Sequence, residues 1–245
     1  MLNKYSITAM VLMTVVVACY IGQFYGHLGY VISDKPSDWV DFSDFFGGLV
    51  GPILSFISLI LLIESLNLQN LANKELREEV KRNQKNEQLR SFETYFFGLV
   101  EAQKSSFSNF KLNFPEGLGD TSLNGVCAIR HLEDQIQKIR NESGTDSQIQ
   151  QAIEKIDQEE MIYNTIRIFY NIVKMTCERL SDANGFDGVT RKNQFQTLIS
   201  FTEFSQLRLV MISMQFIESP SANYLKENQE FMDILVGLGG GVNLY

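Results

Sequence analysis

Cysteine and histidine are both scarce in this chain of 245 residues, which holds three of the first and two of the second. The cysteines, Cys19, Cys127 and Cys177, form no Cys-x-x-Cys motif, so a disulfide framework is not expected. The histidines, His27 and His131, are too few for a histidine metal site or a Ser-His-Asp triad. The sequence therefore predicts a protein without a metal or other cofactor.

Basic residues are also in the minority, because the formal net charge is −8 at pH 7. A nucleic-acid-binding protein normally carries a basic face, so direct binding to nucleic acid is not expected. A negative net charge is also a common way for a protein to remain soluble. The charge therefore argues against nucleic acid as a partner but does not indicate which partner the protein binds.

Two glycine-rich stretches look like ligand-binding loops but lack the necessary residues. The segment from Asp182 to Gly188 would need a glutamate at the twelfth position of a calcium loop, where the chain has Asn193. The segment from Gly237 to Gly241 follows no predicted strand and lacks the Lys-Ser/Thr pair of a phosphate loop. With no catalytic set of residues apparent, the sequence predicts a protein that is not an enzyme.

The N-terminal region lacks charge over a long apolar run from Ile7 to Phe24. About 20 apolar residues in a helix cross the hydrocarbon core of a bilayer. A cleaved signal peptide would have a shorter apolar run. A lipoprotein signal is an alternative, because Val16-Val17-Ala18-Cys19 fits the pattern, although more apolar residues follow Cys19.

A second uncharged run extends from Phe45 to Ile63 and is again long enough to span a bilayer. The residues between the two spans, 33–44, are predicted to form a short external loop. Small residues at the start of the second span would let another helix approach closely, and a proline is tolerated there. These predicted packing residues are Gly47, Gly48, Gly51 and Pro52. The alternative is that they only loosen the first turns of the span.

The basic residues that flank the spans predict their orientation. Lys4 precedes the first span, and six basic residues follow the second between Lys74 and Arg90, whereas the loop has one lysine among four aspartates. Positive residues stay on the cytoplasmic side. The expected protein is therefore a multi-pass protein of the bacterial cytoplasmic (inner) membrane, with both termini cytoplasmic and residues 1–63 in contact with the lipid bilayer.

Residues 64–103 contain strong helix formers and no proline, so the second span is expected to continue as a stalk helix. Its apolar residues form an imperfect heptad pattern. A parallel coiled coil that makes the protein a homo-oligomer is one interpretation, and a solvated single helix is the other.

The remaining residues, 104–245, predict a cytoplasmic α-helical domain, so the fold class is all-α. Residues 113–125 are expected to be a loop, residues 195–217 a buried core helix and residues 225–238 the last helix, with no β-hairpin pattern. Three polar residues within the apolar helices are candidates for burial: Arg167, Glu203 and Arg208.

The central stretch resembles the phage abortive infection family of bacterial membrane proteins (AbiC-like). The likeness rests on the run from Trp39 through Asp-Phe-Phe-Gly-Gly to Phe56 and on the box from Ser91 to Val100, and it continues more weakly in later helices. The family-like residues are Trp39, Asp44, Phe45, Phe46, Phe92, Glu93, Phe96 and Phe97.

The resemblance implies a cytoplasmic-membrane protein used against phage infection, an effector that harms or arrests the infected cell. The mechanism is a hypothesis beyond the resemblance: the protein senses infection through its cytoplasmic helical domain and then perturbs the membrane or arrests the cell. A phage protein or a partner protein of the defence system would supply the signal. The alternative is a membrane-anchored sensor or scaffold subunit of a multi-gene defence system, of the retron or toxin type, with no killing activity of its own.

Overall fold

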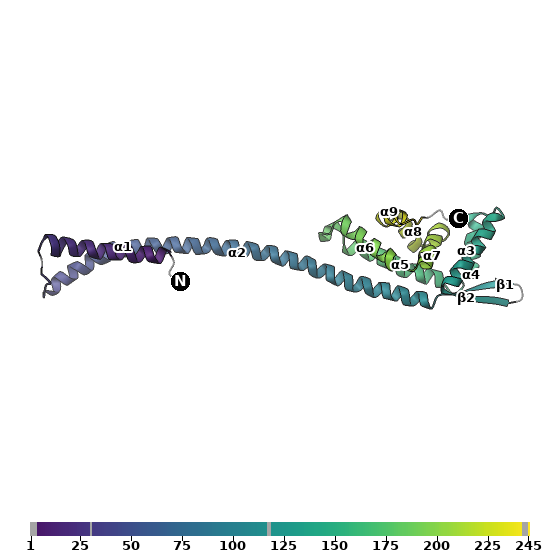
Figure 1. The fold of residues 1–245 in the computed structure, drawn as a ribbon, viewed down its shortest axis with the longest axis horizontal. Coiled ribbons are helices and arrows are strands. Elements are labelled where there is room, and N and C mark those ends of the chain that lie inside the picture. Colours follow the sequence, from purple (N-terminus) through teal and green to yellow (C-terminus); the bar gives the residue numbers. More distant parts are fainter. Residues whose placement is uncertain (1–3, 30, 117–118, 242–244) are drawn as a thin grey trace. The chain divides into compact units, whose positions relative to one another are not determined.

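The computed structural model describes residues 4–29, 31–116, 119–241 and 245, and over these residues the protein is mostly α-helical (Figure 1). The chain forms two compact units, residues 1–82 and residues 83–245. Helix α2, Pro36–Ser108, runs without interruption from the first unit into the second. The boundary between the units falls inside the predicted stalk, residues 64–103.

The first unit consists of α1 (Lys4–Ile21), a short π-helix, η1 (Gly22–His27), and the beginning of α2. Aromatic rings hold the end of α1 and the start of α2 together: the Tyr20 ring lies 4.8 Å from that of Phe42 and 5.4 Å from that of Phe45. The Trp39 indole donates a hydrogen bond to the carbonyl oxygen of Ser33, 2.9 Å away. The connection between the two helices is therefore fixed by aromatic packing.

Both helices of the first unit present apolar side chains outward. Examples are Val11 and Val15 in α1 and Phe56 and Leu59 in α2, each more than half exposed. Two helices, one at 6–27 and one beginning at Pro36, are long and apolar enough to cross a membrane. Exposing an apolar surface of this kind to water is unfavourable. We therefore expect it to contact lipid or another protein.

Helix α2 begins at Pro36, so the prediction of a loop over residues 33–44 is wrong for its second part. Proline is favoured in the first turn of a helix, where its missing N–H loses no bond. Pro52 lies inside α2, as a membrane helix permits. A Cβ on Gly47, Gly48 or Gly51 would meet no atom within 4 Å. Among the residues that the structure describes, no neighbour occupies the space beside these glycines, and their packing against another helix stays a prediction.

The second unit contains a β-hairpin that the sequence did not predict. Strands β1 (Lys111–Glu116) and β2 (Gly119–Asn124) pair antiparallel, with Leu112 opposite Leu123 and Phe114 opposite Thr121. The expected loop at 113–125 is therefore wrong. Leu112 and Phe114 are buried and alternate with polar residues. This two-residue alternation is typical of a strand that packs one face against the core. Pro115 conceals this pattern in the sequence, because proline usually interrupts strands.

The helices of the second unit are α3 (Gly125–Asn141), α4 (Asp146–Ile156), α5 (Met161–Arg179), α6 (Gly188–Phe201), α7 (Phe204–Phe216), α8 (Pro220–Glu227) and α9 (Gln229–Gly237), with a short 3-10 turn, η2 (Asp182–Asn184). The predicted helices at 195–217 and 225–238 are each split in two. Extended backbone at Thr202 and Glu203 divides the first, and Asn228 divides the second by capping α9 through Phe231 N–H.

The core of the second unit includes α2 and the helices that follow the hairpin. Phe92, Phe96, Phe169, Phe195 and Phe231 are each at most 1% exposed. Ile162, Ile166, Phe169 and Val173 of α5 follow one another by three or four positions and are all buried, so they form the apolar face of this helix. Burial of these rings supplies the main stabilisation of the unit, because each aromatic side chain removes a large apolar area from water.

Candidate functional site

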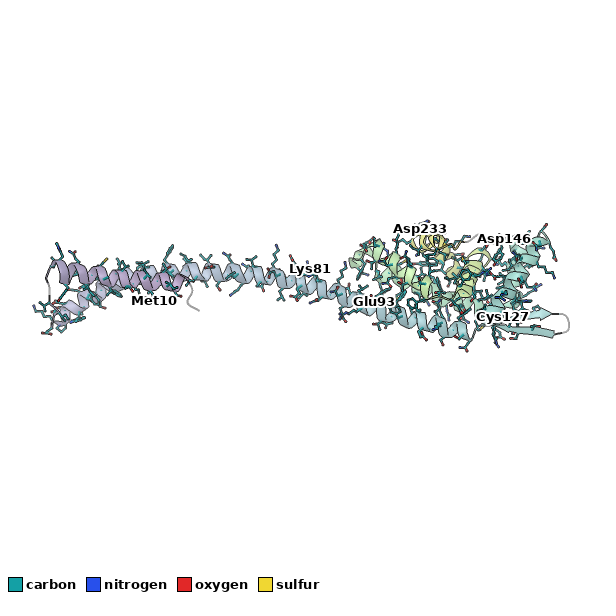
Figure 2. The ribbon with its side chains drawn as sticks, viewed as in Figure 1. Met10, Lys81, Glu93, Cys127, Asp146 and Asp233 are labelled. Atoms are coloured by element: carbon teal, nitrogen blue, oxygen red, sulfur yellow. The ribbon has the colours of Figure 1, made fainter. Side chains whose placement is uncertain are left out.

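The part of α2 that lies in the second unit has one buried face, and this face joins the long helix to the helical core. Leu89, Phe92, Phe96 and Phe107 follow a spacing that places them on one side of the helix. Figure 2 shows α2 around Glu93 lying beside the other helices of this unit. Movement of α2 along its axis would therefore have to disturb the core packing.

Gln103 is the polar member of this buried face and is 2% exposed. Its amide nitrogen donates a hydrogen bond to the Thr202 hydroxyl, 3.0 Å away, and that hydroxyl donates to the Leu198 carbonyl at 2.7 Å. The Gln103 carbonyl oxygen and the amide nitrogen of buried Gln206 have no hydrogen-bond partner. Buried polar groups without partners are costly, so this contact between α2 and the α6–α7 corner is less well satisfied than the rest of the core.

Replacing Gln103 by leucine is expected to leave the unfolding free energy unchanged or to raise it by about 1 kcal/mol. The substitution removes an unsatisfied carbonyl and keeps most of the buried volume, while Thr202 retains its bond to Leu198. Gln103→Ala should instead cost about 1–2 kcal/mol because it leaves a cavity. Thermal unfolding of the full chain in detergent measures both. A loss for leucine as large as that for alanine would contradict this account.

Arg191 lies near the start of α6, whereas Thr202 follows the end of that helix. The Arg191 side chain links α6, α9 and η2. Its guanidinium makes two bonds of 2.7 Å to Glu230 and further bonds to the Leu180 carbonyl and to Asp182. The Arg191 side chain is only 11% exposed. The guanidinium lowers the pKa of the Glu230 carboxyl below its usual value. The two-pronged geometry is the strong form of an arginine–carboxylate pair and serves here to hold helices together.

A second polar group joins α3, α7 and the last described residue. Glu133, 7% exposed, accepts bonds of 2.5 Å from the Arg208 guanidinium and from the Tyr245 hydroxyl. Burial and the neighbouring Glu133 carboxylate raise the pKa of Tyr245 to about 12. The Gln215 amide also donates to the Tyr245 backbone carbonyl at 3.0 Å. These bonds anchor Tyr245 against the helical unit.

A cavity of about 160 Å³ in the second unit lies among α4, α5 and α7. Ile153, Ile166 and Ile217 line its apolar part, and Asp157 lies at its wall. Burial raises the pKa of the Asp157 carboxyl, although that carboxylate accepts the N–H of Ile162 at 3.0 Å. Asp157 therefore has a structural partner at the start of α5.

The predicted polar residues have different environments from those expected. Arg167 and Glu203 are exposed, so the prediction of burial is wrong for both. Arg167 lies over the Tyr163 ring on the outer face of α5, and Glu203 is the residue that precedes α7, at the corner between α6 and α7. Arg208 is half-buried through its pair with Glu133.

The family-like residues fall into two groups. Trp39, Phe45 and Phe46 belong to the first unit, where the Phe46 ring stacks on Phe42 at 5.7 Å, and Asp44 lies between them on α2. Phe92, Phe96, Phe97 and Glu93 belong to the second unit, where Phe92 and Phe96 are fully buried. The two motifs thus mark the two ends of α2 and do not form one site.

The sequence interpretation overlooked Gln103, Thr202, Arg191 and Glu230. Gln103 could have been found, because it follows Phe96 by seven positions and precedes Phe107 by four, which puts an amide on an apolar face. The Arg191–Glu230 pair joins residues 39 positions apart, and no local pattern indicates it.

Among the described residues no group of three or more histidine, cysteine or acidic side chains could hold a metal ion, and the three cysteines are free. Comparison of the chain with protein-family models, with curated proteins and with solved structures finds no match. The observations define a mostly α-helical protein with two candidate membrane-spanning helices, the second of which is continuous with a helical unit.

Proposed function

We propose that this protein is a non-enzymatic antiphage effector of the bacterial inner membrane. In this proposal α1 and the apolar part of α2 span the bilayer, both termini are cytoplasmic, and the helical unit receives the infection signal. The orientation is supported by the basic residues of α2 between Lys74 and Arg90 and by the acidic connection between the spans. The assignment to phage defence is supported by the resemblance of the central stretch.

The observation that carries the proposal is the continuity of α2. One helix contains both the apolar residues near Leu59, which are exposed, and the residues near Phe96, which are in the core of the second unit. An α-helix is stiff along its axis because each residue is bonded to the fourth one before it. A change in packing at the Phe96 end is therefore transmitted as a rotation or shift of the same helix in the bilayer.

Expression of the protein alone in a phage-sensitive host tests this proposal. The expected result is fewer plaques, with loss of membrane potential in infected cells but not in uninfected ones, followed with a potential-sensitive dye. Protection without depolarisation would sink the membrane-perturbing mechanism. Protection that requires neighbouring genes would support the sensor or scaffold alternative.

A further inference from the structure

The cavity among α4, α5 and α7 is buried on one side and reaches solvent on the other. Ile153, Ile166 and Ser213 line its inner part and are each at most 2% exposed. Glu154 and Tyr163 also line it and are exposed, so a small molecule could enter between them. A concave, mostly apolar space with a few polar groups at one side is the usual form of a small-molecule site.

The volume of the cavity limits the size of the molecule that it could hold. It encloses about 160 Å³. An apolar cavity of about 150 Å³ in a protein interior holds one benzene molecule. The buried part of this cavity therefore has room for one ring or for a short branched chain of similar volume, which would contact the isoleucine side chains around it.

The charged residues that line the cavity within the described part of the chain are both acids, Glu154 and Asp157. Asp157 makes no ion pair with any described residue. Its carboxylate accepts the backbone N–H groups of Ile162 at 3.0 Å and of Tyr163 at 3.4 Å, yet burial still raises the pKa of this carboxyl. A cation placed beside the carboxylate would stabilise its ionised form and would itself be stabilised.

The turn between α4 and α5 fixes the position of Asp157. Glu160 in this turn has a φ of 53°, in the left-handed region, and its N–H donates to the Asp157 carbonyl oxygen at 3.0 Å. This conformation is unfavourable for a residue other than glycine, and such strain is found preferentially at ligand sites. Because the turn already holds the carboxylate at the cavity wall, a ligand would not have to order it on binding.

We infer that this cavity binds a small primary amine, whose apolar body fills the buried part and whose ammonium group pairs with Asp157. Glu154 at the exposed side adds a second negative charge that attracts the same cation. A neutral molecule of equal size would leave Asp157 without a countercharge, and an anion would be repelled by both carboxylates. The inference rests on the second unit alone and is independent of the membrane anchoring and of the role in phage defence.

Titration of the full chain in detergent with 4-fluorobenzylamine tests this inference, with binding followed by fluorine NMR of the ligand. We expect saturable binding. The alcohol 4-fluorobenzyl alcohol has the same ring without the positive charge, and it should bind about tenfold or more weakly, because a hydrogen bond between charged groups is stronger than one to a neutral group. The comparison also corrects for uptake of the ring by detergent micelles.

Two substitutions test the charge and the location separately. Asp157→Asn keeps an oxygen for the N–H of Ile162 but removes the charge, so it should weaken binding of the amine about tenfold or more and leave binding of the alcohol unchanged. Ile217→Trp should weaken binding of the amine because Ile217 lines the cavity and is only half-buried, so a larger ring can occupy the space. The control is Asp134→Asn, which removes an exposed acid of α3 and should leave the affinity unchanged.

Three results would overturn the inference. No saturable binding of the amine to the wild-type chain at millimolar concentrations would remove the site. Equal binding of the amine and the alcohol would refute a cationic ligand, and equal binding of the amine to Asp157→Asn and to the wild type would refute the role of Asp157. The melting temperature of each variant shows whether it folds, and if Asp157→Asn does not, the amine–alcohol comparison and Ile217→Trp still decide.

Discussion

Insertion of Gly-Ser-Gly-Ser after Arg77 is expected to reduce phage protection to the level of cells that lack the protein. All side chains around Arg77 on α2 are exposed, so the insertion disturbs no packing. Each glycine costs about 1 kcal/mol in a helix interior relative to alanine, and four flexible residues break the continuity of α2. The apolar α1–α2 segment and the helical unit would then fold but no longer move together.

The matched control is an insertion of seven helix-forming residues, Ala, Glu and Lys, at the same position. Seven residues make almost two turns and rotate the two halves of α2 by only about 20°. Protection should therefore be largely retained. Plaque counts and membrane potential are measured for both variants at equal amounts of protein in the membrane fraction. Full protection by the Gly-Ser variant would show that α2 is only a tether, as the scaffold alternative requires.

Glu230→Ala is expected to lower the free energy of unfolding of the second unit by about 2–3 kcal/mol, the range for hydrogen bonds to charged groups. The substitution removes two bonds of 2.7 Å and leaves the Arg191 guanidinium, which is 11% exposed, with only its bonds to Leu180 and Asp182. The control is Asp233→Ala on the same helix, labelled in Figure 2. Asp233 is exposed and, among the described residues, bonds only its neighbour Gln229, so its loss should cost less than about 0.5 kcal/mol. Thermal unfolding of the full chain in detergent, with hydrogen exchange of α9, measures the difference.

Glu230→Gln keeps the shape of the side chain and tests the charge itself through pH. Because Arg191 lowers the pKa of Glu230 in the folded protein, the carboxylate stabilises the fold above its ordinary pKa of 4.5. This stabilisation is lost progressively as the pH falls below 4.5. In that range the Glu230 carboxyl of the unfolded chain binds a proton, which must be released for the folded ion pair to form. The difference in melting temperature between wild type and Glu230→Gln should therefore be full at pH 7 and narrow towards pH 3. A difference that is constant over this range would assign the effect to packing alone.

Local sequence patterns did not predict the β-hairpin or the breaks that divide two of the expected helices. The alternation of Leu112 and Phe114 is short and is interrupted by Pro115, so strand and loop look alike until the packing of α3 and α4 against the hairpin is known. The corner at Thr202 and Glu203 has no glycine or proline to mark it. Thr202 ends α6 there with an extended backbone, and its hydroxyl accepts a hydrogen bond from the Gln103 amide of α2.

By itself the sequence determined the two apolar helices, the uninterrupted run of helix formers in α2, and the apolar face of α5. These features depend on composition and on the spacing of residues a few positions apart. Such local patterns are enough to specify a helix and its apolar face. Only the tertiary structure decided that Gln103 meets Thr202, that Arg191 meets Glu230, and that Arg167 and Glu203 face solvent. Contacts between residues that are far apart in the chain depend on how whole helices pack, and no local pattern fixes that packing.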